Sequence, residues 1–369
     1  MSSPLRHLFR FQESGLLLVI LALGVLLTVF SGSVRIPSFE LAADGSRQRV
    51  FTVGADGERV PAFVEKNKFL NTQNLAQLAK DTSFIAIMAV GMSIVIIAGG
   101  IDLSVGSIYA LGSVIGALTF QRFGAATGTA PWLAVTLGAL ACVGTAALCG
   151  LANGGLIVSL RVHPFIITLG AMAILRGIAF VATKGQSIGG FPPLFRELVR
   201  KETSGGLSLV PLGVMLVVLV VGWIFLSRLA AGRRVYAVGG NELASRFSAI
   251  RVERVKLGVY LLSGLAAGVS ALIALGYYGS ASSGDGQGYE LNVIAAAVVG
   301  GASLTGGRGT ALGAVLGALI IQMISSGIVI LGIDQNYSQI IIGTVVIAAV
   351  VLDNFNTWLA KRRLTAKAG

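Results

Sequence analysis

The sequence predicts an all-α, polytopic integral membrane protein that crosses the bilayer about ten times. Of its 369 residues, 54% are hydrophobic and only 12% are charged, whereas soluble domains carry roughly 25% charged residues. Apolar runs long enough for a bilayer core of about 30 Å recur between Gly15 and Asp353. These runs are continuous rather than alternating in polarity, so they indicate helices and not the strands of a closed barrel.

The first apolar run follows a short basic segment that contains Arg6 and Arg10. A cleaved signal peptide has a similar layout, but this run is long and no clear small-x-small cleavage site follows it. We therefore expect a retained first transmembrane helix over residues 15–31, with residues 1–14 in the cytoplasm.

Residues 32–80 form the most polar stretch and are expected to make an extracytoplasmic loop. Within this loop, two β-prone runs flank the glycine-rich turn 54–57, which predicts a hairpin, and Pro61 restricts its second strand to a sheet edge. The amphipathic residues 70–80 are expected to lie at the membrane interface before the next span.

A transmembrane core is expected over residues 81–354. Its spans are predicted near 81–99, 103–122, 131–160, 163–183, 209–229, 257–277, 290–303, 310–331 and 337–354. With the first helix these make ten, and an even number puts both termini on one side, which the basic tail 355–369 marks as cytoplasmic. The segment 290–303 is short and could be re-entrant; losing it and one span near Asp102 would give eight spans with unchanged sidedness.

One internal repeat is visible in the core. Residues 99–118 align without gaps with residues 300–319, and eleven of the twenty aligned positions are identical. The shared spacing favours a duplicated unit, and transporters are often built from repeats with the substrate path at their interface. An even number of intervening spans would make the two units parallel, and an odd number would invert them.

Two ionisable residues lie at apparent membrane depth. Asp102 sits in "GGIDLSVGS" (99–107), and a carboxylate at this depth is a functional candidate. A helix that starts after the glycine break also presents free N–H groups that Asp102 or Ser104 can cap, and we favour capping. Arg176, in the span 163–183, is expected to pair with a carbonyl or a carboxylate inside the bundle.

Residues 239–251 are predicted to form a short amphipathic helix on the cytoplasmic side. Two glycines break the preceding segment, Asn241 can cap the helix, and Leu243, Phe247 and Ile250 fall at helical spacing. Such a helix either lies against lipid headgroups or projects into the groove of a partner.

Catalytic and nucleic-acid-binding functions are not expected. The chain has two histidines and no pair of carboxylates on a helical stripe, and residues 301–308 lack the lysine and hydroxyl of a phosphate-binding loop. We therefore expect no catalytic residue, metal site or bound cofactor in this chain. The net charge of +12 is concentrated in short segments beside apolar runs, which is typical of cytoplasmic loops rather than of nucleic-acid binding.

Four motifs occur in order along the core. They are "GMSIVIIAGGIDLSVGSIYAL" (91–111), "PFIITLGAMAILRGIA" (164–179), "VYAVGGNELASRFSAIRVERVKLGVYLLSG" (235–264) and "GYELNVIAAAVVGGASLTGGRGTALGAVLGALI" (288–320). Together they resemble the permease subunits of bacterial ATP-binding-cassette (ABC) importers for monosaccharides of the ribose, xylose and galactose type. The similarity runs from about residue 69 to 353 and implies a type II ABC importer-like permease.

The resemblance also implies roles for particular residues. The helix after "GGN" would dock on the ATPase through Gly240, Asn241, Ala244, Ser245, Phe247 and Ile250. Asp102, Ser104, Arg176 and Asn292 are the candidates for the translocation path or the helix breaks. Two positions depart from the family pattern: Asn292 replaces a usual aspartate, and Tyr278 replaces a common arginine. The insertion 31–68 is longer than the family leads us to expect.

The chain is thus expected to be a lipid-embedded gate in a bacterial inner membrane. The resemblance implies a second permease subunit, identical or related, with the sugar path between the two, ATPase subunits that use the ATP, and a periplasmic sugar-binding protein. A permease of the same superfamily for another small solute remains an alternative. An ion-coupled secondary transporter is another, although it would need more ionisable residues at membrane depth than this chain supplies.

Overall fold

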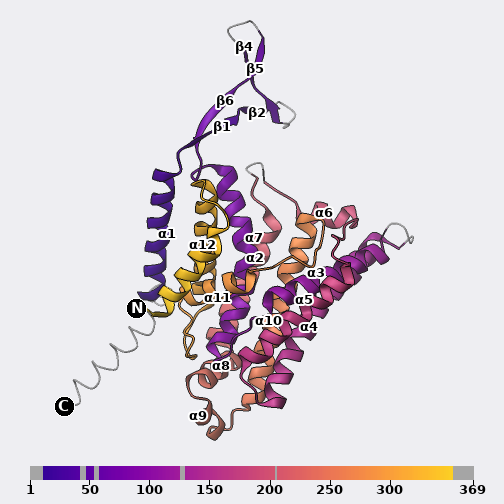
Figure 1. Cartoon of the computed structure of the whole chain (residues 1–369), viewed down its shortest axis with the longest axis vertical. Helices are drawn as coiled ribbons and strands as arrows, with labels where there is room; N and C mark the ends of the chain where they lie inside the picture. The colour runs from indigo at the N-terminus through magenta and orange to yellow at the C-terminus, as the bar shows by residue number, and fades with distance from the viewer. Residues whose placement is uncertain (1–10, 42–46, 54–57, 125–128, 204–205, 352–369) are drawn as a thin grey trace, which may run out of the picture.

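The structure is a computed structural model that describes residues 11–41, 47–53, 58–124, 129–203, 206–351 of the chain. Most of the predicted cytoplasmic N-terminus, the hairpin turn 54–57 and the basic tail 355–369 lie outside the described residues. The described part consists of a helical body with an arm of short β-strands at one end (Figure 1).

The helices of the body follow the predicted spans closely. They are α1 (Phe11–Phe30), α2 (Thr72–Ile97), α3 (Val105–Arg122), α4 (Pro131–Leu160), α5 (Pro164–Thr183), α6 (Pro193–Val199), α7 (Leu209–Arg228), α8 (Ala230–Gly240), α9 (Glu242–Phe247), α10 (Val252–Tyr278), α11 (Tyr289–Val299), α12 (Ala311–Ile330) and a last apolar helix, Tyr337–Val351. Each of the ten predicted spans therefore corresponds to a helix.

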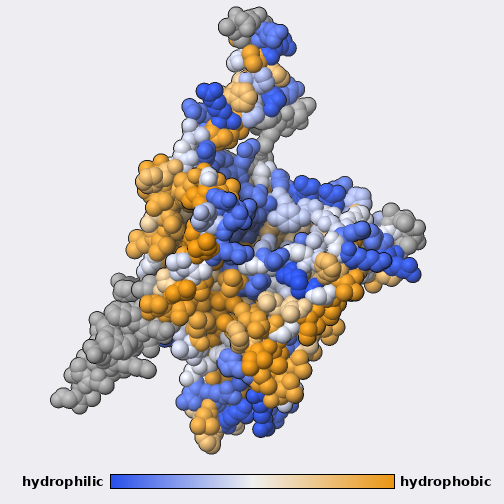
Figure 2. All heavy atoms as spheres, viewed as in Figure 1, coloured by the Kyte–Doolittle hydropathy of each residue, from blue (hydrophilic) through white to orange (hydrophobic). Residues whose placement is uncertain are grey.

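Seven of these helices are long and apolar enough to cross a membrane, within the residues that the structure describes. The eleven residues of α11 cover only about 16 Å, roughly half of a bilayer core, because a helix rises about 1.5 Å per residue. The prediction that this segment is short for a full crossing is confirmed. Figure 2 shows hydrophobic residues across most of the middle of the body, with hydrophilic residues at the arm end and at the α8–α9 end.

The start of α2 corrects one prediction. The expected interfacial segment 70–80 is the first part of α2, and the helix begins at Thr72 instead of residue 81. The Asn71 side chain caps it by accepting a hydrogen bond from the Asn74 backbone N–H at 2.9 Å. The polar face that suggested an interfacial position contributes Asn74 and Gln77 to the lining of a polar chamber, described below.

The arm contains the predicted hairpin within a longer ribbon. Strands β4 (Phe51–Val53) and β5 (Arg59–Pro61) pair antiparallel, with Thr52 opposite Val60. At the base, β1 (Ser33–Pro37) pairs with β6 (Phe63–Asn67), and β2 (Phe39–Leu41) pairs with β3 (Arg47–Arg49). Each sheet has only two strands, so Pro61 sits on an edge as predicted.

Glycine allows the core helices α4 and α10 to pack at backbone contact. A Cβ on Gly150 would lie 2.3 Å from the Tyr260 carbonyl oxygen, and one on Gly264 would lie 2.4 Å from the Ala146 carbonyl oxygen. Small residues at helix interfaces serve the same purpose in membrane proteins generally, because van der Waals packing replaces the hydrophobic effect there.

The internal repeat corresponds to two equivalent helix pairs, α2–α3 and α11–α12. In each pair, the aligned residues form a break between the helices and the first part of the second helix. Both α2 and α11 run antiparallel to α12: the Ser326 hydroxyl donates to Asn74 Oδ1, whereas Gly313 packs on Gly300 and Gly317 on Ala296. The two units are therefore parallel, as an even number of intervening spans predicts.

Candidate functional site

The helix breaks of the two repeat units meet at the end of α8. The Gly307 backbone N–H, in the second break, donates to the carbonyl oxygen of Ile97, the last residue of α2, at 2.9 Å. Gly239 of α8 packs on the same carbonyl so closely that a Cβ there would lie 1.7 Å from the oxygen. This backbone junction joins α2, α8 and the α11–α12 break directly, and α8 leads into the helix that is expected to receive the ATPase.

Alanine substitution at this junction should affect the stability of the chain very differently at two adjacent glycines, Gly239 and Gly240. Gly239→Ala makes a methyl group overlap with the Ile97 carbonyl oxygen. We therefore expect the folded chain to lose several kcal/mol of stability. The measurement is the thermal-unfolding midpoint of the purified protein in detergent, which should fall. Gly240→Ala is the matched control, because nothing lies within 4 Å of its Cβ position. A Gly239→Ala protein as stable as Gly240→Ala would contradict the close contact.

Asp102 is fully buried and holds the first break in place. Its Oδ1 accepts from the Ser104 backbone N–H at 3.0 Å and from the Ser104 hydroxyl at 2.6 Å, while its Oδ2 accepts from the Ser263 hydroxyl of α10 at 2.9 Å. Asn153 of α4 donates to the Ser104 hydroxyl oxygen at 2.7 Å. Asp102 thus binds the residue that precedes α3 and does not cap an N–H group of the helix itself. The Ser104 side chain makes no cap hydrogen bond either and instead connects Asp102 to Asn153.

The second break repeats this arrangement in a weaker form. Ser303 aligns with Asp102, and Thr305 aligns with Ser104. The hydroxyls of Ser303 and Thr305 are hydrogen-bonded to each other at 2.9 Å. The same side-chain contact between residues two apart therefore marks both breaks, but only in the first is the acceptor a carboxylate.

Arg176 pairs with carbonyl groups, one of the two partner types that the sequence suggested. Its Nη1 donates to the backbone carbonyls of Ser283 and Asp285 at 2.7 and 2.6 Å. These carbonyls belong to the loop between α10 and α11, so Arg176 ties α5 to the start of the second repeat unit.

Asn292 lines a polar chamber near the base of the arm. The chamber has a volume of about 510 Å³ and is formed by α2, the end of α10, α11, α12 and the segment after α12. Amides and aromatic rings dominate its lining, including Asn74, Gln77, Tyr278, Tyr289, Asn292 and Gln322. The structure thus brings together both positions that depart from the family pattern, Asn292 and Tyr278. It does not bring Asp102, Ser104 or Arg176 into this lining.

The α2 side of the chamber was missed by sequence reasoning. Asn74, Gln77 and Asp81 face it, and Gln77 donates to Asp81 at 2.9 Å. Their spacing of three and four residues places them on one helix face, which is the signal that could have revealed them. Beside them, the buried Lys80 amine pairs with Asp81 at 3.3 Å and lies 4.4 Å from the centre of the Tyr277 ring.

At the opposite end of the body, α9 forms a short projection (Figure 1). The Asn241 side chain caps α9 by accepting from the Ala244 backbone N–H at 2.9 Å, as predicted. Leu243 and Phe247 are 64% and 83% exposed. Two exposed apolar side chains of this size on a six-residue helix are typical of a surface that meets a partner or lipid headgroups.

Ion pairs hold α9 against the start of α10. Glu242 accepts from Lys256 at 2.8 Å and from Arg246 at 3.0 Å, and Arg246 also pairs with Glu253. The hydrogen bond from Lys256, followed by that from Arg246, lowers the pKa of Glu242 below its usual value, although partial burial opposes the shift. The network is therefore intact at neutral pH.

The predicted helix 239–251 is wrong in its extent. Gly240 ends α8, α9 stops at Phe247, and Ala249 adopts a left-handed φ of 59° that turns the chain away. Ile250 consequently lies outside the helix and lines a groove. Ser245 is buried, with its hydroxyl donating to the Asn241 carbonyl at 2.9 Å, so its side chain supports the turn and does not face a partner.

This fold and these sites define a polytopic α-helical membrane transport subunit with a polar chamber at one end and a small projecting helix at the other. Comparison with known proteins gives the family: the chain belongs to the branched-chain amino acid transport system / permease component family, whose model matches residues 74–350. The sequence-based resemblance to ABC importer permeases is confirmed, and the chain is a transport subunit and not an enzyme.

Several curated relatives are similar in sequence to this chain over most of its length. It is 38% identical over 291 residues to the ribose import permease protein RbsC of Escherichia coli K12, covering 78% of this chain and 87% of that protein. It is 35% identical to the D-allose transport system permease protein AlsC of the same strain, covering 77% and 84%. The autoinducer 2 import system permease protein LsrD of E. coli O9:H4 is 33% identical, covering 80% and 90%. No solved structure matches the chain significantly.

Proposed function

We propose that this chain is the membrane permease of an ATP-driven importer for a monosaccharide. The family match across residues 74–350 carries the proposal, and the relatives named for ribose and D-allose import support the solute class. In this proposal the chain pairs with a second permease subunit, separate ATPase subunits hydrolyse ATP, and a soluble binding protein delivers the sugar. Both termini and α9 face the cytoplasm, and the arm faces the periplasm.

The chamber suits a neutral polyhydroxylated solute. Amide side chains both donate and accept hydrogen bonds, as sugar hydroxyls do, and the rings of Tyr278 and Tyr289 offer flat apolar faces to the C–H faces of a pyranose or furanose. Asp81 is the chamber's one carboxylate, and it already pairs with Lys80. A few polar groups converging in a concave site are typical of small-molecule recognition.

The proposal is tested by uptake into proteoliposomes that contain the permease, its ATPase and its binding protein. We expect accumulation of labelled monosaccharide only when ATP is present with the ATPase and when the binding protein is on the opposite face. Uptake driven by an imposed ion gradient without ATP would contradict the proposal and favour a secondary transporter. Accumulation of a non-sugar solute alone would leave the ATP-driven mechanism but overturn the solute class.

Asn292→Leu should slow sugar uptake without affecting assembly. The change removes the amide's N–H donors and its acceptor oxygen from the chamber. Losing a hydrogen bond of about 1–1.5 kcal/mol corresponds to roughly a five- to twelvefold lower initial uptake rate. Asn336→Leu is the control, because Asn336 lies just beyond α12 and does not line the chamber. Equal uptake rates for Asn292→Leu and Asn336→Leu would show that the chamber is not part of the sugar path.

The arm is the proposed seat for the binding protein. It carries exposed apolar side chains at Phe51, Val53, Val60, Phe63 and Val64, although a two-stranded ribbon has no core of its own to bury them. It projects from the end of the body at which α2 begins (Figure 1), and the first turns of α2 line the chamber. It lies outside the segment matched by the family model.

Shortening the arm tests this role. Removing residues 36–64 and joining Arg35 to Glu65 through Asn-Gly makes a tight hairpin, because these two residues are already paired. The construction keeps Asn67, which accepts from the backbone N–H groups of Phe69 and Leu70 and donates to Thr28. We expect the affinity for the binding protein to fall at least tenfold, measured by titration in detergent, while the ATPase still co-purifies. Unchanged affinity would remove the arm from binding.

A further inference from the structure

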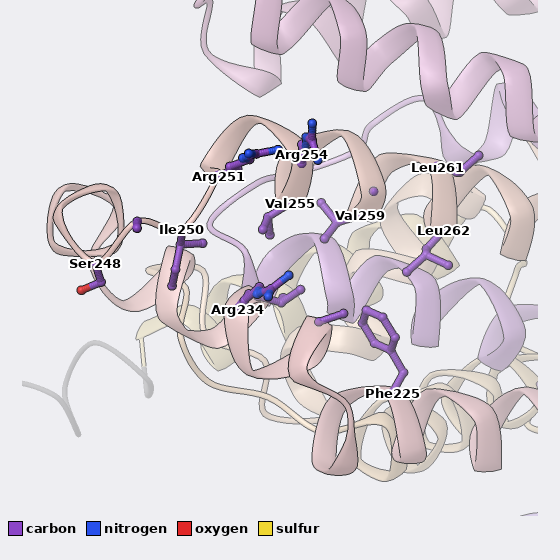
Figure 3. Close-up of a pocket in the computed structure, with 14 residues that line it drawn as sticks. Phe225, Arg234, Ser248, Ile250, Arg251, Arg254, Val255, Val259, Leu261 and Leu262 are labelled. Atoms are coloured by element: carbon purple, nitrogen blue, oxygen red, sulfur yellow. The ribbon is translucent and has the colours of Figure 1, made fainter.

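A groove of about 660 Å³ lies between the α7–α8 corner and the start of α10, at the α9 end of the body. Figure 3 shows its two parts. Arg234 lies opposite Arg251 and Arg254, with the side chains of Val255 and Val259 between them. Farther from Ser248, the groove continues past Phe225, Leu261 and Leu262.

The ionisable groups of this groove all carry the same charge. They are Arg234, Arg251 and Arg254, and none of the three forms an ion pair within the part of the chain that the structure describes. The neighbouring cavity differs, because there Glu242 and Glu253 balance its basic side chains. Three guanidinium groups with no acid among them favour a ligand that brings negative charge.

The rest of the groove is apolar and runs along a membrane-spanning helix. From Arg254 to Leu262 along α10 is about 12 Å at 1.5 Å per residue, and α10 spans Val252–Tyr278. The arginines therefore lie at the end of the span, at interface level, while the leucines lie at hydrocarbon depth. A soluble protein loop could contact the arginines, but its polar backbone would be poorly solvated along the apolar part of the groove inside the bilayer.

We propose that this groove binds an anionic phospholipid of the surrounding membrane. Its phosphate is held among Arg234, Arg251 and Arg254, and one acyl chain lies along Val255, Val259 and Leu262. Basic pockets between transmembrane helices recognise anionic headgroups in this way. Because Ser248, Ala249 and Ile250 form one wall, the lipid also supports the turn that leaves α9. The site is independent of the transported solute.

The first test compares lipid retention by native mass spectrometry after extraction from nanodiscs of equal phosphatidylglycerol and phosphatidylcholine. We expect the wild-type permease to retain phosphatidylglycerol selectively. Arg251→Gln with Arg254→Gln should retain it about 30-fold less well, the factor expected when two arginines near an anionic headgroup are neutralised. The charge-matched control is Arg161→Gln with Arg228→Gln, since neither residue lines the groove.

A second variant tests the apolar floor without changing charge. Gly258 lines the groove and has nothing within 4 Å of its Cβ position, so Gly258→Phe fills the groove without distorting α10. We expect it to displace phosphatidylglycerol, whereas Gly144→Phe, at an equally open position on α4, should not.

Four results would overturn the proposal. These are equal retention of phosphatidylcholine, equal retention by the two arginine double variants, unchanged retention by Gly258→Phe, and displacement of the lipid by inorganic phosphate alone, which would indicate a site for a free anion. If the arginine double variant lost its ATPase but kept its lipid, the groove would be a protein contact instead.

Discussion

Phe247→Asp is expected to separate the permease from its ATPase while leaving the fold intact. Phe247 is 83% exposed, so a carboxylate there stays in water and costs the folded chain little. In a docked complex the same carboxylate would be buried in an apolar groove without a partner. Loss of an aromatic anchor of this kind weakens association by about 2–4 kcal/mol, or roughly 30- to 1000-fold. Co-purification of the ATPase and ATP-dependent sugar uptake are the two measurements.

Two further variants make this result specific. Phe247→Ala removes the ring without adding charge and should weaken the ATPase complex in the same direction. Phe63→Asp makes the same change at an exposed phenylalanine of the arm and should leave ATPase association unchanged. Normal uptake by Phe247→Asp would show that α9 does not couple the permease to the ATPase. Labelling of Phe247→Cys from the periplasmic side would show that the proposed orientation is wrong.

Asp102→Ala should cause a large loss of stability. It leaves the Ser104 N–H, the Ser104 hydroxyl and the Ser263 hydroxyl without their acceptor in a fully buried site. At roughly 1 kcal/mol for each such group, the free energy of unfolding should fall by about 3 kcal/mol. The measurement is thermal or denaturant-induced unfolding of the purified permease.

Controls distinguish a structural role for Asp102 from a role in the path. Asp102→Asn retains an acceptor oxygen and should lose less stability than alanine. Ser303→Ala changes the aligned position of the second repeat unit, where the hydroxyl is bonded to Thr305 and no carboxylate is present, and should cost less stability than Asp102→Ala. If Asp102→Ala were as stable as the wild type but transported sugar poorly, Asp102 would belong to the translocation path.

Local features of the fold could be predicted from the sequence because they depend on neighbouring residues. Hydropathy over about twenty residues located every long helix. The Asn241 cap joins residues only three apart, and the arm's hairpin depends on a turn between adjacent strands. The repeat is likewise visible in the sequence, because its two copies retain the same spacing of small residues.

Features that join distant segments could not be predicted. Arg176 was expected to pair with a carbonyl or a carboxylate, but its acceptors lie 107 and 109 residues away in the chain. The amphipathic residues 70–80 were expected to precede the first core span, but they form the start of α2 and contribute Asn74 and Gln77 to the chamber lining. A sequence cannot show which helices a polar face will meet. Ile250 was assigned to α9 by its spacing, but the left-handed backbone at Ala249 ends that regularity.

The sequence by itself thus determined that this protein is a helical permease, where its helices break, and that a short helix begins beside Asn241. Only the tertiary structure decided which of its polar groups face a chamber and which stabilise the interior. The physical reason is that caps, turns and apolar spans are local properties of the chain, whereas a chamber lined by α2, α10, α11 and α12 exists only after helices far apart in sequence have packed together.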